Sequence, residues 1–328
     1  MLMHFYLQKG VKKMSFLDDT TSLFKQMIDY RKSVGFATAT YECSIPPFIE
    51  YSAKNHPDAN QITKEMVDEW LEYYSFQTSS TQSVFIAMLR KFTGFINAQG
   101  QKAFIPDEDY SVKREQYHPY IFNDNELLTL FNTIDAHKPY RGNGLKYKTE
   151  LILPVLFQMM YCCGMRPAEP LHLRCEDVDL SCGDIYIRQT KSNKERHIIM
   201  SDDMLRLCRI YISAIGKHEW FFPHPDGGRL STNWMTYQFH VCWKNSGLKK
   251  RGNPRPYDFR HAFATRTIMR WIDEGKDVMV LLPYLSTYLG HAEIRSTFYY
   301  IHLLPDRIRK SSGIDWDMFS SIYEEVES

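Results

Sequence analysis

Basic side chains are concentrated in two stretches of the chain. One runs from Lys244 to Arg270 and contains a single acidic residue, Asp258; the other runs from Arg188 to Arg196 and contains only Glu195. The basic residues are Lys244, Lys249, Lys250, Arg251, Arg255, Arg260, Arg266 and Arg270 in the first stretch, and Arg188, Lys191, Lys194 and Arg196 in the second. Such local density is typical of a surface that binds the phosphate backbone of a nucleic acid, although either stretch alone would also fit a solvated surface patch.

The net charge of the whole chain does not reveal these two basic stretches. Over 328 residues, 40 lysines and arginines are balanced by 39 aspartates and glutamates, for a net charge of +1. That balance excludes only a uniformly basic protein, since phosphate affinity depends on where the charges lie. A content of 44% hydrophobic and 24% charged residues is typical of a globular chain, and the length suggests two domains.

Four segments, two of which lie within these basic stretches, carry residues capable of chemistry in a fixed order. They are Gly164–Leu173 (GMRPAEPLHL), Thr190–Arg196 (TKSNKER), Tyr257–Thr265 (YDFRHAFAT) and Leu289–His291 (LGH), the last followed by Thr297 and Tyr300. In type and order they resemble the catalytic domain of the tyrosine recombinase (phage integrase) family, over roughly Tyr120 to Leu304. Each pattern alone is weak, but four in the family's order predict membership.

The resemblance implies a reaction and a set of residues for it. A tyrosine hydroxyl, assigned to Tyr300, attacks a DNA phosphodiester and leaves a 3′-phosphotyrosyl bond that is later religated. Arg166 and Arg260 would clamp the non-bridging oxygens through permanently charged, bidentate guanidinium groups. Lys191 would protonate the leaving 5′-hydroxyl, and His291 would donate a hydrogen bond to the same phosphate.

Several neighbours compete for these roles or support them. Glu169 and His261 are expected to orient the catalytic groups. Tyr299 adjoins Tyr300, but the family's spacing from the Leu-Gly-His motif selects Tyr300. Lys194 and Arg196 are alternatives to Lys191, and register with the family's hairpin favours Lys191.

One position departs from the family pattern. The family usually places histidine or lysine where Tyr257 stands, three residues before Arg260. Tyrosine, with an ordinary pKa near 10, donates hydrogen bonds but is a poor general base at neutral pH. We expect Tyr257 to donate to the phosphate and cleavage to be slowed but retained, with an aromatic core residue as the alternative reading.

Expected partners and cofactors follow from the same resemblance. We expect DNA contacts from Lys194, Arg196, Lys249, Lys250, Arg251 and Arg255. The partners would be double-stranded DNA carrying a specific recombination site, further copies of the chain in a tetramer on that DNA, and accessory recombinases or directionality factors. No metal or other cofactor is expected, since no carboxylate cluster with metal-ligand spacing accompanies these groups. Neither a membrane span nor a signal peptide is indicated, which predicts a cytoplasmic, nucleoid-associated protein.

The expected fold is mainly α with a small antiparallel β-sheet, arranged as a two-domain DNA clamp. A helical core-binding domain would cover residues 15–105, a linker 106–118, and the catalytic domain with a C-terminal helix 119–328. Residues 1–14 would be an N-terminal extension, either a short tail or a mis-assigned start, because Lys9-Gly10 reverse-translates to a ribosome-binding sequence just before Met14.

Hydrophobic periodicity and capping residues place the elements. Helices are predicted over Phe16–Val34, after Thr63, from about Ser79 to Gly100, after Asn123 or Asn125, and over Lys148–Cys163. Two strands are predicted over Ile185–Ile187 and His197–Met200. The pattern after these strands predicts further helices to the end of the chain. In the last helix Trp316, Phe319, Ile322 and Tyr323 share one face, which could pack in cis or on a neighbouring protomer.

The leading functional hypothesis is a site-specific recombinase, the integrase or transposase of a mobile element. A chromosome-dimer-resolving recombinase and a catalytically impaired DNA-binding relative are the alternatives. A type IB topoisomerase shares the chemistry but needs neither a specific site nor a partner-docking tail.

Overall fold

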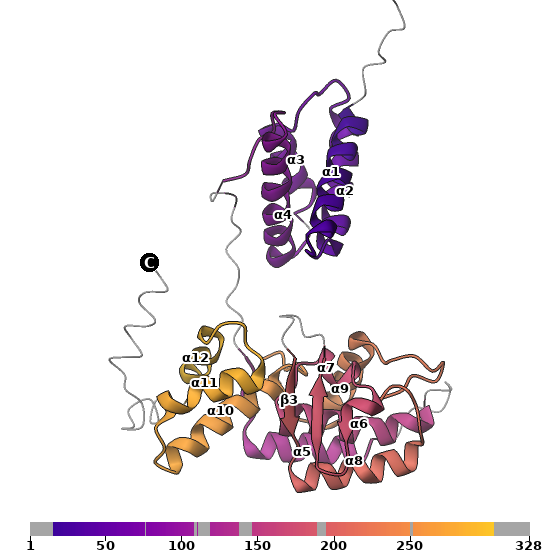
Figure 1. Ribbon diagram of the computed structural model, residues 1–328, viewed down its shortest axis with the longest axis vertical. Helices are drawn as coiled ribbons and strands as arrows, with labels where there is room; N and C mark the ends of the chain where they lie inside the picture. The colour runs from indigo at the N-terminus through magenta and orange to yellow at the C-terminus, as the bar shows by residue number, and fades with distance from the viewer. Residues whose placement is uncertain are drawn as a thin grey trace, which may run out of the picture. The chain divides into compact units, whose positions relative to one another are not determined.

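The computed structural model describes residues 16–75, 77–107, 110, 119–137, 146–188, 195–249 and 252–304. The chain divides into two compact units, Met1–Tyr117 and His118–Ser328. The predicted fold class, mainly α with a small antiparallel sheet, is confirmed (Figure 1). The predicted N-terminal extension, most of the predicted linker and the predicted C-terminal helix lie outside the described residues. No described helix is both long and apolar enough to cross a membrane.

The first unit consists of helices around an aromatic core. The helices are α1 (Phe16–Ser33), α2 (Ala39–Asn55), α3 (Lys64–Tyr73) and α4 (Ser79–Ala98). Phe48 packs edge-on against Trp70 and tilted against Phe85, with ring centroids 6.0 and 5.7 Å apart. As predicted, the Thr63 side chain caps α3 by accepting a hydrogen bond from the backbone of Met66.

Hydrophobic periodicity does not predict helix α2. It contains Pro46 and Pro47, which ordinarily argue against a helix interior because proline lacks the N–H donor. Nevertheless Ile45, Phe48 and Ile49 are buried, and α2 packs against α1 and α4. Tertiary packing therefore outweighs the local cost of the two prolines.

The second unit surrounds a larger core with helices and one small sheet. Its helices are α5 (Asp124–Asp135), α6 (Lys146–Cys163), α7 (Ala168–Leu171), the 3₁₀ helix η2 (Cys175–Asp177), α8 (Asp202–Ile215), α9 (Thr232–Asn245), α10 (Asp258–Asp273), α11 (Val278–Leu289) and α12 (Arg295–His302). Asn123, rather than Asn125, caps α5 in a reciprocal capping box with Glu126. Helix α6 packs against α5, α8 and α10, as its apolar sequence predicts.

The sheet has the order β1-β2-β3 and is antiparallel throughout. Its strands are β1 (Val178–Asp179), β2 (Asp184–Ile187) and β3 (Arg196–Ile199), of which the two-residue β1 was not predicted. Ile185 lies opposite Ile198, and Ile187 opposite Arg196. Along β3, Arg196 and Ile198 are buried while His197 and Ile199 are exposed, so the alternation turns Arg196 toward the core.

Candidate active site

Helix α10 turns a charged side chain, Arg260, fully into the interior. Its exposed fraction is 0%, and its Nη1 and Nη2 donate to the carbonyls of Gly164 and Leu289 at 2.9 and 2.6 Å. Its Nε has no hydrogen-bond partner within the described part of the chain. Burial lowers the pKa of Arg260, yet arginine starts so high that the guanidinium remains charged. A buried cation with a donor to spare suits an anionic ligand.

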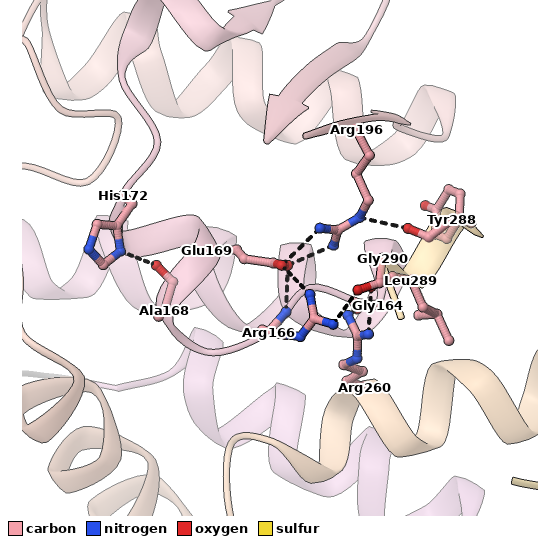
Figure 2. Close-up of polar contacts among 10 residues, drawn as sticks. All are labelled: Gly164, Arg166, Ala168, Glu169, His172, Arg196, Arg260, Tyr288, Leu289 and Gly290. Atoms are coloured by element: carbon pink, nitrogen blue, oxygen red, sulfur yellow. Dashed lines mark hydrogen bonds and ion pairs between the residues drawn. The ribbon is translucent and has the colours of Figure 1, made fainter. Parts of the chain in front are cut away.

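Gly164 shapes the turn that leads from α6 to Arg166. Its φ of +61° lies in the left-handed region, and a Cβ there would come within 2.4 Å of the Phe263 ring. Beyond the turn, Arg166 Nη1 donates to Glu169 Oε1 at 2.9 Å, and the backbone N–H of Arg166 donates to Glu169 Oε2 at 2.8 Å. Arg166 Nη2 donates to the carbonyl of Gly290 at 2.6 Å, so the first and last motifs meet here (Figure 2).

The end of α11 and the start of α12 bring His291 and Tyr300 together. Gly290 closes α11 in the left-handed conformation, and His291 follows with its Nδ1 2.7 Å from Oγ1 of the buried Thr297. The Tyr300 ring is 2% exposed and stacks on His291 with centroids 6.0 Å apart. Tyr299 is only half-buried. This packing favours Tyr300 over Tyr299 as the nucleophile.

Two more predicted residues line the same site, His261 from α10 and Tyr257 from the position just before this helix. The His261 ring lies 5.6 Å from that of Tyr300 and 4.9 Å from that of Tyr257, one helical turn earlier. Buried His261 Nδ1 has no hydrogen-bond partner among the described residues. The half-buried Tyr257 therefore contacts the same His261 ring that packs against Tyr300.

The electrostatics of the cluster fix its protonation states near neutral pH. Burial and then the neighbouring arginines lower the pKa of His291 to about 3 and of His261 to about 4, so both rings are neutral. Burial raises the pKa of Tyr300 to about 12, against the pull of Arg260. Burial would also raise the pKa of Glu169, but its bonds and charge interaction with Arg196, and then Arg166, outweigh burial and lower it. The resting site therefore holds a protonated tyrosine among cations.

The structure brings some of the predicted site residues together, whereas others lie elsewhere or outside the described residues. The structure brings together Arg166, Glu169, Tyr257, Arg260, His261, His291 and Tyr300. Lys191, Lys194, Lys250 and Arg251 lie outside the described residues. Lys249 is exposed, whereas Arg255 is half-buried and its backbone N–H donates to Asp258 Oδ2 at 2.7 Å.

Arg196 differs from its prediction as a DNA contact. Its side chain is 7% exposed, its Nη1 and Nη2 bind the two oxygens of Glu169, and its Nε donates to the carbonyl of Tyr288. Counting basic residues could not reveal this, because charge density carries no direction. The alternation of the hairpin could have done so, since it places residue 196 on the same face as the apolar Ile198. The motif likewise contains Thr297 without indicating that its hydroxyl contacts His291 Nδ1.

Buried arginines around a buried tyrosine define a class of site suited to attack on a phosphodiester. A sequence model of the phage integrase family matches residues 122–307, more than half of the chain. The chain therefore belongs to the phage integrase family, whose tyrosine recombinases cleave and rejoin DNA.

Individual relatives and solved structures are consistent with this family. The chain is 26% identical to a putative integrase/recombinase, y4rB, of Sinorhizobium fredii over 88% of this chain and 94% of that protein. It is 26% identical to the tyrosine recombinase XerD of Staphylococcus aureus over 82% and 88%. The fold is shared with XerH recombinase bound to its difH substrate (TM-score 0.61, 22% identity, 86% and 81% covered). It is also shared with a lambda integrase tetramer bound to a Holliday junction (TM-score 0.62, 16% identity, 93% and 81% covered).

Proposed function

We propose that this protein is the site-specific recombinase of a mobile element, acting through a 3′-phosphotyrosyl bond to Tyr300. The observation that carries the proposal is the convergence of Tyr300, Arg166, Arg260 and His291 from separate elements on one buried point. In the cell it would work in the cytoplasm on nucleoid DNA.

The roles follow from the donors that each side chain offers. A scissile phosphate would bind between Arg166 and Arg260. Arg260 Nε, which has no hydrogen-bond partner among the described residues, would be available to one of its oxygens. The Tyr300 oxygen forms a bond to phosphorus and gives its proton to water, while the bond from phosphorus to the 5′-oxygen breaks. The 5′-oxygen takes a proton, which we assign to Lys191. His291, held by Thr297, would donate to the phosphate as negative charge develops there.

Substitution of Tyr257 tests the position at which the third motif departs from the family pattern. If its hydroxyl donates to the phosphate, Tyr257→Phe should slow single-turnover cleavage about tenfold, the effect of one lost hydrogen bond. Tyr257→His, which installs the family's usual residue, should cleave faster than the parent. The control is Tyr284→Phe, since Tyr284 is 70% exposed on α11. Cleavage by Tyr257→Phe at the parent rate would remove Tyr257 from the mechanism.

Self-association is supported by an open apolar groove on the second unit. The groove has a volume of about 880 Å³, and its lining includes Phe122, Tyr161, Phe263, Met269, Leu303 and Leu304. The lining also includes Arg266 and Arg270, which pair with Asp124 and Glu274 in this chain. The tail of the sequence carries Glu324, Glu325 and Glu327 after its apolar face. We assign the groove to the tail of a neighbouring protomer in a DNA-bound tetramer.

Removal of the tail tests this assignment. A chain ending at Lys310 should still form a covalent adduct on a single site, because no site residue is lost. It should fail to assemble tetramers and to exchange strands between two sites, as measured by sedimentation of protein–DNA complexes and by plasmid recombination. Normal tetramers without the tail would contradict the assignment.

Resolution of chromosome dimers is the second candidate, because the tyrosine recombinase XerD of Staphylococcus aureus has the same sequence identity to this chain, 26%, as the integrase-like relative, over a somewhat smaller part of it. A plasmid carrying two copies of the DNA that borders the gene distinguishes these roles. Deletion between the copies supports a mobile-element recombinase, whereas recombination only at a single chromosomal site supports dimer resolution. Relaxation of supercoils without recombination would indicate a topoisomerase, and DNA binding alone an impaired relative.

A further inference from the structure

Three consecutive carbonyl oxygens at the C-terminal end of α11 each accept a hydrogen bond from a different arginine. The pairs are Tyr288 with Arg196 Nε at 2.7 Å, Leu289 with Arg260 Nη2 at 2.6 Å, and Gly290 with Arg166 Nη2 at 2.6 Å (Figure 2). The last carbonyls of a helix lack intrahelical partners and form the negative end of its dipole. The end of α11 thus acts as a common anchor for three guanidinium groups.

Glu169 is the second anchor, and Arg196 is bound to it through both carboxylate oxygens. Arg196 Nη1 lies 2.9 Å from Oε1 and Nη2 lies 2.8 Å from Oε2, in a bidentate pair whose two side chains are 7% and 6% exposed. The same carboxylate accepts two bonds from Arg166. Figure 2 shows Glu169 lying between the two arginines. All three guanidinium nitrogens of Arg196 are therefore engaged inside the protein.

The packing around Arg196 is close as well as polar. A Cβ at position 290 would come within 3.0 Å of Arg196 Nη1 and 3.2 Å of its Cδ, so the glycine leaves room for this side chain. Burying an ion pair is seldom a gain in stability over an apolar pair of similar size. Geometry, which a bidentate arginine pair fixes and an apolar contact does not, is a better account of its presence here.

We propose that Arg196 is a positioning residue for DNA cleavage: it fixes the carboxylate of Glu169, which in turn holds Arg166 toward the scissile phosphate. Because Arg196 opens β3, the same contacts tie this strand to α7 and to the end of α11. This inference rests on the proposed function, since it assigns a support to the same phosphate site.

The test separates DNA binding from the rate of cleavage. The probe is a duplex selected by the Tyr300→Phe protein from a randomised library, nicked so that cleavage releases a short fragment. Arg196→Met and Arg196→Lys are compared with Arg206→Met, which removes a 73% exposed arginine from α8. We expect both Arg196 variants to bind within about twofold of the parent affinity but to cleave about 10- to 100-fold more slowly at saturation, because misplacing a catalytic group by about 1 Å can cost about 10²-fold in rate.

Arg196→Lys covers the case in which Arg196→Met does not fold, because lysine keeps the buried charge but offers no bidentate pair to Glu169. A double-mutant cycle provides the readout that a general structural role would not give. In a protein that already carries Glu169→Gln, adding Arg196→Lys should slow cleavage by less than about a further threefold, because Arg196 acts through Glu169.

Three outcomes would overturn the inference: an unchanged cleavage rate in Arg196→Lys, a loss confined to DNA affinity, or multiplicative losses in the cycle. Failure of the parent itself to form an adduct with any selected duplex would instead overturn the proposed function.

Discussion

Replacement of Tyr300 by phenylalanine is expected to abolish the covalent protein–DNA adduct while DNA binding and folding persist. The change deletes one oxygen atom and keeps the ring that stacks on His291 and contacts His261. Because that oxygen is the proposed nucleophile, the rate of adduct formation should fall by more than about 10⁴-fold. Denaturing gels of protein incubated with the nicked selected duplex measure the adduct directly.

The neighbouring tyrosine is the matched control for this experiment. Tyr299→Phe removes a hydroxyl from the adjacent, half-buried residue of α12 and should leave adduct formation unchanged. An adduct that survives Tyr300→Phe and disappears in Tyr299→Phe would transfer the role to Tyr299.

Replacement of Arg260 is expected to have the next largest effect, on both catalysis and stability. Arg260→Met leaves the carbonyls of Gly164 and Leu289 without their guanidinium donor, at a cost of about 1–3 kcal/mol each in the free energy of unfolding. It also removes a cation from the phosphate site, which should slow cleavage about 10²- to 10³-fold. Urea denaturation and single-turnover cleavage measure the two effects separately.

Arg260→Lys distinguishes charge from geometry at this position. Lysine restores the positive charge but not two donors in fixed directions, so part of the stability should return while cleavage stays slow. Cleavage by Arg260→Lys at the parent rate would show that charge alone, and not the fixed geometry of the guanidinium, is what the site needs at this position. Arg206→Met, on the exposed face of α8, should change neither measurement.

The sequence predicts elements best where a local signal coincides with the packing. Thr63 and Asn123 both mark helix starts by side-chain caps, and both caps are present. Helix α2 was missed because Pro46 and Pro47 argue locally against it, and only its buried contacts with α1 and α4 explain it. Strand β1 was missed because two residues are too short for an alternating pattern.

For the candidate site as well, the sequence indicates which residues meet but not how their side chains are oriented. Motif order was enough to select Arg166, Arg260, His291 and Tyr300, which the fold brings together from distant parts of the chain. What no motif contains is the direction of each side chain. Arg196 and Arg260 both count toward the basic stretches of the sequence, yet both are buried, one bound to Glu169 and the other to two carbonyls. The basic stretches of the sequence therefore contain both exposed charges and the buried arginines of the site itself.

The central claim is that Tyr300 becomes linked to a DNA 3′-phosphate, and the most direct measurement is the chemistry of the trapped product. The parent protein is incubated with the nicked selected duplex, digested with protease, and the DNA-linked peptide is identified by mass spectrometry. We predict a single linked peptide, with the 3′-phosphate on Tyr300 and a free 5′-hydroxyl on the released fragment. Linkage to another residue, attachment through a 5′-phosphate, or cleaved DNA with no attached peptide would contradict the account.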